Sequence, residues 1–376
     1  MFFQRGDMFL LCICLVCAFY GVTMVYITAS GMYNGGWSIQ APSRLVMVQG
    51  VSMVLGLIAY VIFTFIDADL IGRQWKLLSA IILALLIALK LFGEGGDSTG
   101  NNSWIRFGSI GIQPSEIIKV IYIVLAAYQM SRLKERGDIN SIPAVAQMVG
   151  GLLLVFGSIV LVSSDLGSAS VILCIFVAMF FALGVRLYWF AIGGAAVAAA
   201  VPLIWTYFLK DHQKQRLVAP YDPTIDPDGY GITWQTTQSV QSLASGRLTG
   251  IDADHTSTIF TGKHTDFIFA GIGERLGIIG CIVVLILLTV IVFHCAKIGI
   301  RSGRTYDMLI CVGVAASVEF QMLINVGMCM GKTPVIGITL PFFSYGGSSM
   351  MTMFAAMGLV SGVKYKPKPQ LFSSMY

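Results

Sequence analysis

Long apolar runs alternate with short polar segments along the chain, and this pattern predicts membrane-spanning helices. Each run has about 20 residues, the length that an α-helix needs to cross the hydrocarbon core of a bilayer. Ten such runs occur, near residues 9–30, 45–66, 77–93, 114–130, 143–163, 167–185, 188–208, 267–296, 307–328 and 345–363. We therefore predict an all-α polytopic membrane protein of about ten transmembrane helices, with a long polar loop at about 209–266, between helices 7 and 8.

The distribution of basic residues orients these spans, because short cytoplasmic loops are enriched in Lys and Arg. On the other side, the short loops carry only Arg44, Arg106 and Lys332. Basic residues are much more frequent in the segments on the side of the termini: Arg5, Arg73, Lys76, Arg132, Lys134, Arg136, Arg186, Lys297, Arg301, Arg304, Lys364, Lys366 and Lys368. The pattern predicts cytoplasmic termini and an extracytoplasmic loop at about 209–266.

Composition supports a protein that lies almost wholly in the membrane. Charged residues make up 11% of the chain and hydrophobic residues 56%, whereas a soluble domain has about 25% charged residues. We expect a single membrane domain over residues 1–376, without a separate soluble enzyme domain. The net charge of +5 does not indicate a nucleic-acid partner, because the basic residues flank spans, and no His and Cys spacing indicates a zinc site.

Four predicted spans begin with polar segments that all face the side of the long loop. These segments are Gln113–Glu116, Ser164–Gly167, His264–Asp266 and Ser344–Ser349. A helix N-terminus presents free backbone N–H groups and the positive end of the helix dipole, which suits phosphate. Ordinary capping by Ser, Asp or Pro explains any one segment, Asp165 included, but not the ionisable side chains just inside several of them.

Asp266 is the central candidate, because a carboxylate at the start of a membrane span is costly and is commonly functional. If the helix includes it, Asp266 shares one face with Ala270, Gly273 and Gly277. This face would leave room for a substrate below the carboxylate. Nearby Lys263 and the helix N-terminus are expected to favour the ionised form of Asp266.

Two further groups of residues carry candidate chemistry. Glu116 and Lys119 share a helix face about one turn inside the fourth span, where they form either a buried ion pair that locks packing or a site for a diphosphate. In the long loop, Trp234 is followed by amides and hydroxyls, among them Gln238 and Ser239, a composition that suits a sugar.

These motifs resemble the SEDS family (shape, elongation, division and sporulation), which includes RodA, FtsW and SpoVE proteins. The resemblance covers essentially the whole chain and includes two long, specific strings. The matching segments are Trp104-Ile105, Gln113-Pro114-Ser115-Glu116 with Lys119, Asp165-Leu166-Gly167, Gln238-Ser239, His264-Thr265-Asp266-Phe267-Ile268-Phe269-Ala270, Pro334-Val335 and Ser344-Tyr345-Gly346-Gly347-Ser348-Ser349.

The resemblance implies a peptidoglycan glycosyltransferase of the bacterial cytoplasmic membrane, which polymerises lipid II into glycan strands at the outer face during elongation, division or sporulation. It places the essential aspartate at Asp266 and substrate-binding residues at Glu116 and Lys119. It also implies a class B penicillin-binding protein as partner, with lipid II and a polyprenyl-diphosphate-linked glycan as ligands.

Chemical reasoning adds roles to these positions. Asp266 would accept the proton of the acceptor hydroxyl, and Arg106 and Lys263 would stabilise the departing diphosphate. Asp165 and Ser348, at outward-facing helix starts, complete the candidate substrate-binding set. A divalent cation, Mg²⁺ or Mn²⁺, could share the task of stabilising the diphosphate, and the sequence identifies no ligands for it.

Two other classes of function stay open at this point. A transporter (flippase) that moves a lipid-linked precursor would also have ten spans with charged residues, although its site would be expected near the middle of the membrane. A non-catalytic scaffold of a division or elongation complex would not need the polar helix starts. The role of Asp266 separates these possibilities.

Overall fold

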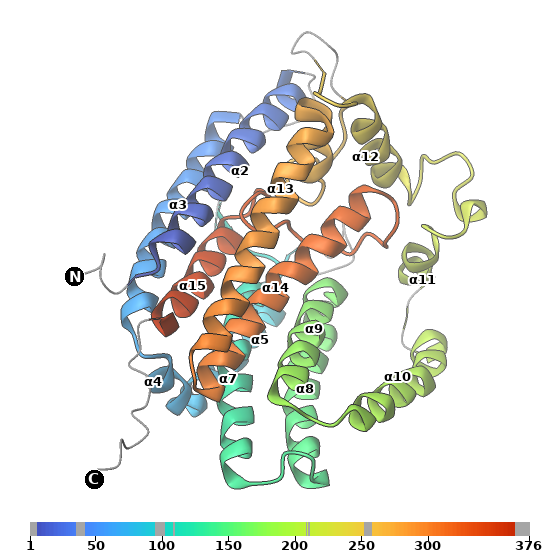
Figure 1. Ribbon diagram of the computed structural model, residues 1–376. Coiled ribbons are helices and arrows are strands. Elements are labelled where there is room, and N and C mark those ends of the chain that lie inside the picture. Colours follow the sequence, from blue (N-terminus) through green and yellow to red (C-terminus); the bar gives the residue numbers. More distant parts are fainter. Residues whose placement is uncertain are drawn as a thin grey trace.

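A single bundle of long helices contains most of the chain (Figure 1). The computed structural model describes residues 6–34, 42–94, 102–107, 110–207, 209, 211–251 and 258–364. Within these residues, ten helices of 18 residues or more occupy the predicted positions. They are α2 (Met8–Asn34), α3 (Pro42–Phe65), α5 (Trp75–Phe92), α7 (Pro114–Arg136), α8 (Ile142–Ser163), α9 (Leu166–Leu183), α10 (Leu187–Tyr207), α13 (Ile268–Arg301), α14 (Thr305–Cys329) and α15 (Gly347–Lys364).

Eight of these helices are long and apolar enough to cross a membrane, judged among the described residues by length and composition. The other two are α7, whose apolar stretch contains Glu116 and Lys119, and α15, which is a shorter apolar helix. The predicted division between the sixth and seventh spans is confirmed, because α9 ends at Leu183 and Gly184 has a left-handed backbone (φ +92°). The protein is a multi-pass, all-α membrane protein.

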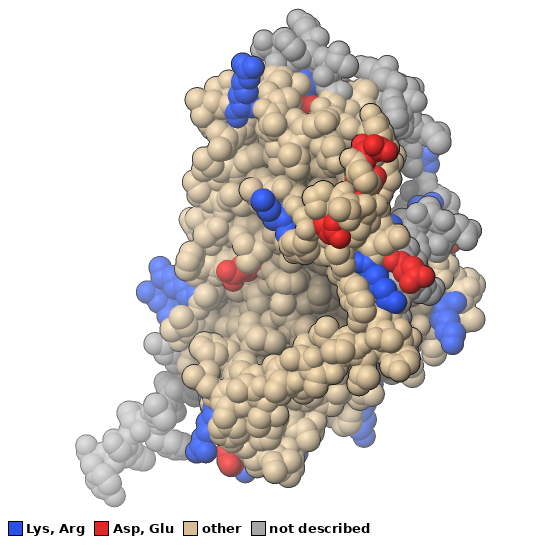
Figure 2. Space-filling model, turned by 90° about the vertical axis from the view of Figure 1, so that its right-hand side faces the viewer, with Lys and Arg blue, Asp and Glu red and all other residues tan. Residues whose placement is uncertain are grey.

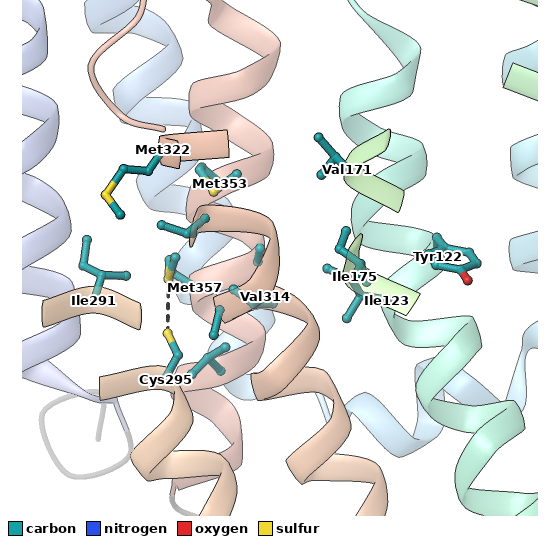
Figure 3. Packing of buried hydrophobic residues seen from close by; sticks show 14 of the residues in the cluster. Tyr122, Ile123, Val171, Ile175, Ile291, Cys295, Val314, Met322, Met353 and Met357 are labelled. Carbon is teal, nitrogen blue, oxygen red and sulfur yellow. Dashed lines mark hydrogen bonds between the residues drawn. The ribbon is translucent and has the colours of Figure 1, made fainter. Parts of the chain in front are cut away.

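Side chains from five helices form the centre of the bundle (Figure 3). Ile291 and Cys295 of α13 meet α15, where the sulfur atoms of Cys295 and Met357 lie 3.9 Å apart. Val314 of α14 and Ile123 of α7 are also buried here, and α9 packs on both of these helices. Small residues bring other helix pairs close: a Cβ on Gly56 of α3 would lie 2.8 Å from Phe354 of α15.

The two ends of the described chain lie at the same end of the bundle. The backbone N–H of Asp7, just before α2, donates to the hydroxyl of Ser361 near the end of α15 (2.9 Å). The Asp7 carboxylate also pairs with His294, in the last third of α13 (2.8 Å). An even number of crossings places the two ends together, as the ten predicted spans require.

The segment between α10 and α13 contains helical structure of its own. It includes α11 (Asp211–Val218), a short 3₁₀ helix η1 (Pro223–Ile225) and α12 (Trp234–Ser245). Figure 1 shows α12 beside the beginning of α13, and α10 leaning away from the other long helices. No residue of α10 is buried, so its apolar side chains are available to lipid. A short hairpin, β1 (Ile105–Phe107) with β2 (Ile110–Ile112), precedes α7, and a one-turn helix, α4 (Ala68–Arg73), precedes α5.

The expected strip of small residues below Asp266 is not open to a substrate. Helix α13 begins at Ile268, after Asp266, so the carboxylate does not share a helical face with Gly273 and Gly277. Gly277 itself is non-helical (φ +63°, ψ −165°). The strip is covered by the end of α12 and the turn after it, because Gly246 lies directly against the backbone of Gly273. The expectation was wrong because the loop returns and packs on the helix that follows it.

We expect Gly246→Ala to displace the turn after α12 from α13. The added Cβ would overlap the carbonyl oxygen of Gly273, and a backbone atom cannot rotate away. Overpacking of this kind costs about 1–3 kcal/mol, so the melting temperature of the purified protein should fall by several degrees. Gly157→Ala in α8 is the matched control, since a Cβ there meets nothing within 4 Å. Equal melting temperatures for the two variants would contradict this packing.

Candidate active site

The four polar helix starts surround one cavity of about 1240 Å³. Gln113 before α7, Asp165 before α9, Asp266 before α13 and Gly347 at the start of α15 all line it. Residues from α11 to α12 form another part of its wall. Figure 2, which views the side of α10, α11 and α12, shows a hollow in this face, with charged side chains above it and an almost uncharged surface below. The expectation that these starts face one side is confirmed.

Three consecutive backbone carbonyls hold Asp266 in position. The carbonyls of residues 264–266 accept hydrogen bonds, in order, from the Tyr345 N–H (2.9 Å), the Ser344 hydroxyl (2.7 Å) and the Asn325 side-chain amide (2.7 Å). All three donors come from α14 or from the segment between α14 and α15. A non-helical backbone inside a membrane protein needs such partners, and here they fix the turn that presents the Asp266 side chain.

Asn325 was not singled out from the sequence, although it has a central position. Its side chain is completely buried, and its amide also donates to the carbonyl of Ile338 (2.7 Å). It therefore joins the turn that carries Asp266 to the irregular segment before α15. A buried amide within an apolar helix is a signal that the sequence contains, but the sequence does not name its partners.

The Asp266 carboxyl has a raised pKa, of about 6. Burial is the main cause, and the negative charge of Asp165 adds to it. Gly337, which has φ +70°, lies against this carboxyl: a Cβ added there would be 3.7 Å from Asp266 Oδ2. The sequence predicted that Lys263 and the helix N-terminus would favour the ionised form of Asp266, whereas burial and Asp165 raise the pKa of this carboxyl.

Lys263 is engaged elsewhere. Its ammonium forms an ion pair with Glu274 of α13, and both side chains are about 1% exposed. The same ammonium donates to the Thr258 carbonyl (2.6 Å), and Glu274 accepts from the Thr258 N–H (2.7 Å). Burial lowers the pKa of Lys263, and Glu274 opposes this effect. The pair fastens the end of the long loop to α13, and Lys263 does not line the cavity.

Asp165 combines the capping role with a place in the cavity wall. One carboxylate oxygen accepts from the Ser168 N–H (2.9 Å) and caps α9. The other accepts from the hydroxyls of Ser168 (2.8 Å) and Ser115 (3.4 Å) and from the Gln113 amide (3.3 Å). These bonds join the starts of α7 and α9 and hold a negative charge close enough to influence Asp266.

Glu116 and Lys119 form the buried ion pair that the sequence suggested. The Lys119 ammonium donates to Glu116 (2.7 Å) and to the Gln321 side chain of α14 (3.2 Å). Both side chains are nearly inaccessible and do not line the large cavity. Of the two interpretations, the geometry favours a buried ion pair that holds α7 against α14. This packing fixes the start of α7, where Gln113 lies one turn before Glu116.

Of the remaining predicted residues, one lines the cavity and the others lie outside its lining. Arg106 lines the cavity from the β1–β2 hairpin, 3.9 Å from Glu94. Ser348 is buried and accepts from the Gln113 N–H (3.2 Å). Ser239 is buried and donates to the Cys329 carbonyl (2.9 Å), and neither it nor Gln238 lines the cavity.

Sequence reasoning did not single out Arg216 of α11 or Gln241 of α12, and both residues line the cavity. Arg216 lies in a polar stretch, where a basic residue gives no signal of its own. The helical spacing of α12 decides which of its amides face the cavity, and the boundaries of this helix could not be read from a polar segment.

Together, the fold and the cavity define a class: a polytopic helical membrane protein with a carboxylate-bearing cavity at the starts of four of its helices. The chain belongs to the FtsW/RodA/SpoVE family of cell cycle proteins, whose family model matches residues 7–368. The similarity therefore extends over every helix of the bundle.

Individual relatives agree with this assignment. The stage V sporulation protein E of Bacillus subtilis is 31% identical over 371 residues, which cover 95% of this chain and 96% of the relative. The peptidoglycan glycosyltransferase MrdB of Escherichia coli is 30% identical over 336 residues, 87% of this chain and 88% of its own. A Geobacter metallireducens protein, described as a probable peptidoglycan glycosyltransferase FtsW, is 28% identical over 97% of this chain and 96% of its own.

Solved structures show the same fold. A chain from a peptidoglycan synthase complex that coordinates polymerization and crosslinking superposes with a TM-score of 0.74 at 28% identity, covering 96% of this chain and 99% of that one. The rod shape determining protein RodA of Thermus thermophilus superposes with a TM-score of 0.66 at 23% identity, covering 96% and 98%.

We predict that the Lys263–Glu274 pair stabilises the protein as a unit. Lys263→Met leaves Glu274 buried without its cation, which costs about 3–5 kcal/mol for a pair of this kind. Adding Glu274→Gln removes the charge and keeps an acceptor for the Thr258 N–H, so much of the loss should be recovered. Thermal unfolding of the purified variants measures both effects. Lys214→Met removes the 26% exposed partner of Asp211, whose own carboxylate is 97% exposed, and as the control it should change little.

Proposed function

We propose that the cavity is a glycosyl-transfer site at which this chain polymerises lipid II into glycan strands. The protein is a peptidoglycan glycosyltransferase of the membrane. The observation that carries this conclusion is the cavity itself, where the Asp266 carboxylate faces the same space as Arg106 and Arg216. The cavity is lined by the starts of four helices and by the segment between α10 and α13, as suits a polymerase of an externally displayed precursor, whereas a transporter would hold its site near the midplane of the membrane.

The reaction needs a base at the acceptor. A sugar hydroxyl of the acceptor attacks the anomeric carbon of a glycan linked to polyprenyl diphosphate. The new glycosidic C–O bond forms, the bond to the diphosphate breaks, and the hydroxyl proton passes to the Asp266 carboxylate. A carboxyl with a pKa of about 6 is ionised at neutral pH and yet basic enough to share a proton, as general-base catalysis favours.

The leaving diphosphate needs positive charge. Arg106 and Arg216 line the cavity and can bind phosphate oxygens with two N–H groups each. The N-termini of α7, α9 and α15 begin at the same cavity and add the positive ends of their dipoles. Lys119 and Lys263, which the sequence suggested for this task, act through the packing around the cavity.

The described residues supply few ligands for a metal ion. They contain no group of three His, Cys, Asp or Glu side chains that could hold one, and one oxygen of Asp165 already accepts three hydrogen bonds. Mg²⁺ commonly binds one or two carboxylates together with substrate phosphates. A divalent cation would therefore be held largely by the diphosphate, with Asp165 or Asp266 beside it, and would supply charge neutralisation there.

The membrane orientation and the partner complete the proposal. Both termini lie in the cytoplasm, and the cavity and the long loop face outwards, in keeping with the excess of Lys and Arg in the short loops on the side of the termini. A class B penicillin-binding protein is the proposed partner that cross-links the product. The similar chain from a synthase complex that coordinates polymerization and crosslinking supports this pairing.

Asp266→Asn should abolish most polymerisation without unfolding the protein. General-base catalysis contributes about 10²–10⁴-fold, so polymer formation from purified lipid II should fall at least 100-fold while lipid II binding persists.

In the wild-type protein, the rate should fall about tenfold per pH unit below about pH 6, where Asp266 becomes protonated. Because folding raises this pKa, its stabilising contribution is complete below about pH 4 and lost as pH rises through about 6. Asp266→Asn should therefore be at least as stable as wild type at pH 7.5.

Asp211→Asn is the matched control for this variant. Its carboxylate is 97% exposed on α11 and does not line the cavity, so this substitution should leave the rate unchanged. A wild-type rate for Asp266→Asn would refute the assignment of the base. Asp165 would then be the next carboxylate to test, because Glu116 and Glu274 do not line the cavity.

The orientation predicts which thiols an impermeant reagent can reach. In a background without Cys12 and Cys174, which are the cysteines that are not buried, a cysteine at Leu248 should react in intact cells, since Leu248 is 63% exposed in the long loop. A cysteine at exposed Arg301, at the other end of α13, should react only after permeabilisation. The reverse pattern would overturn the outward-facing cavity.

A further inference from the structure

An aromatic pair stands beside the cavity at the start of α12. The rings of Tyr230 and Trp234 are stacked, with centroids 5.6 Å apart and an interplanar angle of 23°. Trp234 lines the cavity, whereas Tyr230 is 78% exposed. The pair therefore continues from the cavity wall to an open aromatic surface outside it.

The turn that carries this pair is held by hydrogen bonds. The Asp226 carboxylate accepts from the N–H groups of Gly231 (3.0 Å) and Thr233 (2.9 Å) and from the Thr233 hydroxyl (2.6 Å). These bonds also keep the pKa of Asp226 below its ordinary value. The Trp234 N–H then donates to the Gly231 carbonyl (3.2 Å). The aromatic surface is thus preorganised, which lowers the entropic cost of binding.

The surroundings of the pair suit a carbohydrate better than lipid. Asp228, Thr237 and Gln241 line the same part of the cavity and offer carboxylate, hydroxyl and amide groups for sugar hydroxyls. The axial C–H groups of a pyranose ring pack well on an aromatic face, and an aromatic ring has little conformational entropy to lose. Tyr and Trp also gather at membrane interfaces, but there they lie beside apolar residues.

We propose that Tyr230 and Trp234 form a binding platform for the sugar rings of the growing glycan strand, next to the reaction site. The inference rests on the proposed function and adds a subsite to it. A strand that leaves the Asp266 region along this wall would meet Trp234, which lines the cavity, and then Tyr230, which is exposed beside it. Stacking accepts each successive ring alike, so the platform holds the polymer between additions and still allows it to advance.

Binding of a glycan fragment tests the platform without polymerisation. The probe is a soluble tetrasaccharide of the N-acetylated glycan, titrated into the purified full chain in detergent and followed by saturation-transfer NMR. Loss of one aromatic contact should weaken binding by about three- to tenfold in Tyr230→Ala. Tyr230→Phe keeps the ring and should recover most of the affinity. Tyr207→Ala is the matched control, because Tyr207 is 77% exposed and does not line the cavity.

Product length supplies the second measurement. With lipid II as substrate, Tyr230→Ala should give strands several-fold shorter than the wild type, and Tyr207→Ala should not. An affinity within twofold of wild type for Tyr230→Ala, or an equal loss in Tyr207→Ala, would overturn the platform. A loss of vesicle association in Tyr230→Ala with unchanged fragment affinity would also overturn it and indicate a membrane contact. Trp234→Ala, which removes a partly buried ring, is a second variant, whose folding is checked by thermal unfolding.

The two proposals fail in different ways. If wild-type protein forms no polymer but binds the fragment through Tyr230, the polymerase assignment fails and the carbohydrate site stands. If wild-type protein polymerises lipid II and Tyr230→Ala matches it in both assays, the platform fails and the polymerase assignment stands. Asp266→Asn should bind the fragment like wild type, because the platform does not depend on the base.

Discussion

The need to satisfy three backbone carbonyls determines much of this structure. Residues 264–266 lie outside a helix, close to the apolar interior, where an unpaired carbonyl is costly. Tyr345, Ser344 and Asn325 supply the donors, so the segment from α14 to α15 and the turn before α13 stabilise each other. Because each backbone position is held, the Asp266 side chain is presented to the cavity with little freedom. Preorganised geometry of this kind is what acyl- and glycosyl-transfer sites need.

The buried lysines of this site pair with glutamates and do not pair with Asp266. In the two buried ion pairs, Glu116–Lys119 and Lys263–Glu274, each charge faces its opposite, and the pairs stabilise the helices around the cavity. Among the described residues, no cation forms an ion pair with Asp266, and its pKa is raised by burial and by the negative charge of Asp165. A carboxyl with a raised pKa therefore lines the same cavity as Arg106 and Arg216. The lysines contribute indirectly, through the position of the elements that carry the reacting groups.

The segment between α10 and α13 makes the wall of the cavity. Its turn after α12 seats on α13 through Gly246 and Gly273, and the Lys263–Glu274 pair closes its far end. Earlier in the segment, before both attachments, hydrogen bonds to Asp226 hold the turn that carries Tyr230 and Trp234. A loop that is polar in sequence therefore becomes a defined surface, able to present arginine, amide and aromatic groups together.

The sequence by itself determined the ten helices, because span length and hydropathy are local properties. It also placed four polar helix starts on one side of the membrane, because successive spans run in opposite directions and all four of these spans have even numbers. It also identified Asp266, Asp165 and Arg106 as residues near the site. Only the tertiary structure decided that Lys263 pairs with Glu274, that Asp266 precedes its helix, and that Arg216 and Asn325 belong to the site. These outcomes depend on which side chains meet across distant segments and on how much water burial removes, and neither is encoded in the spacing of residues along the chain.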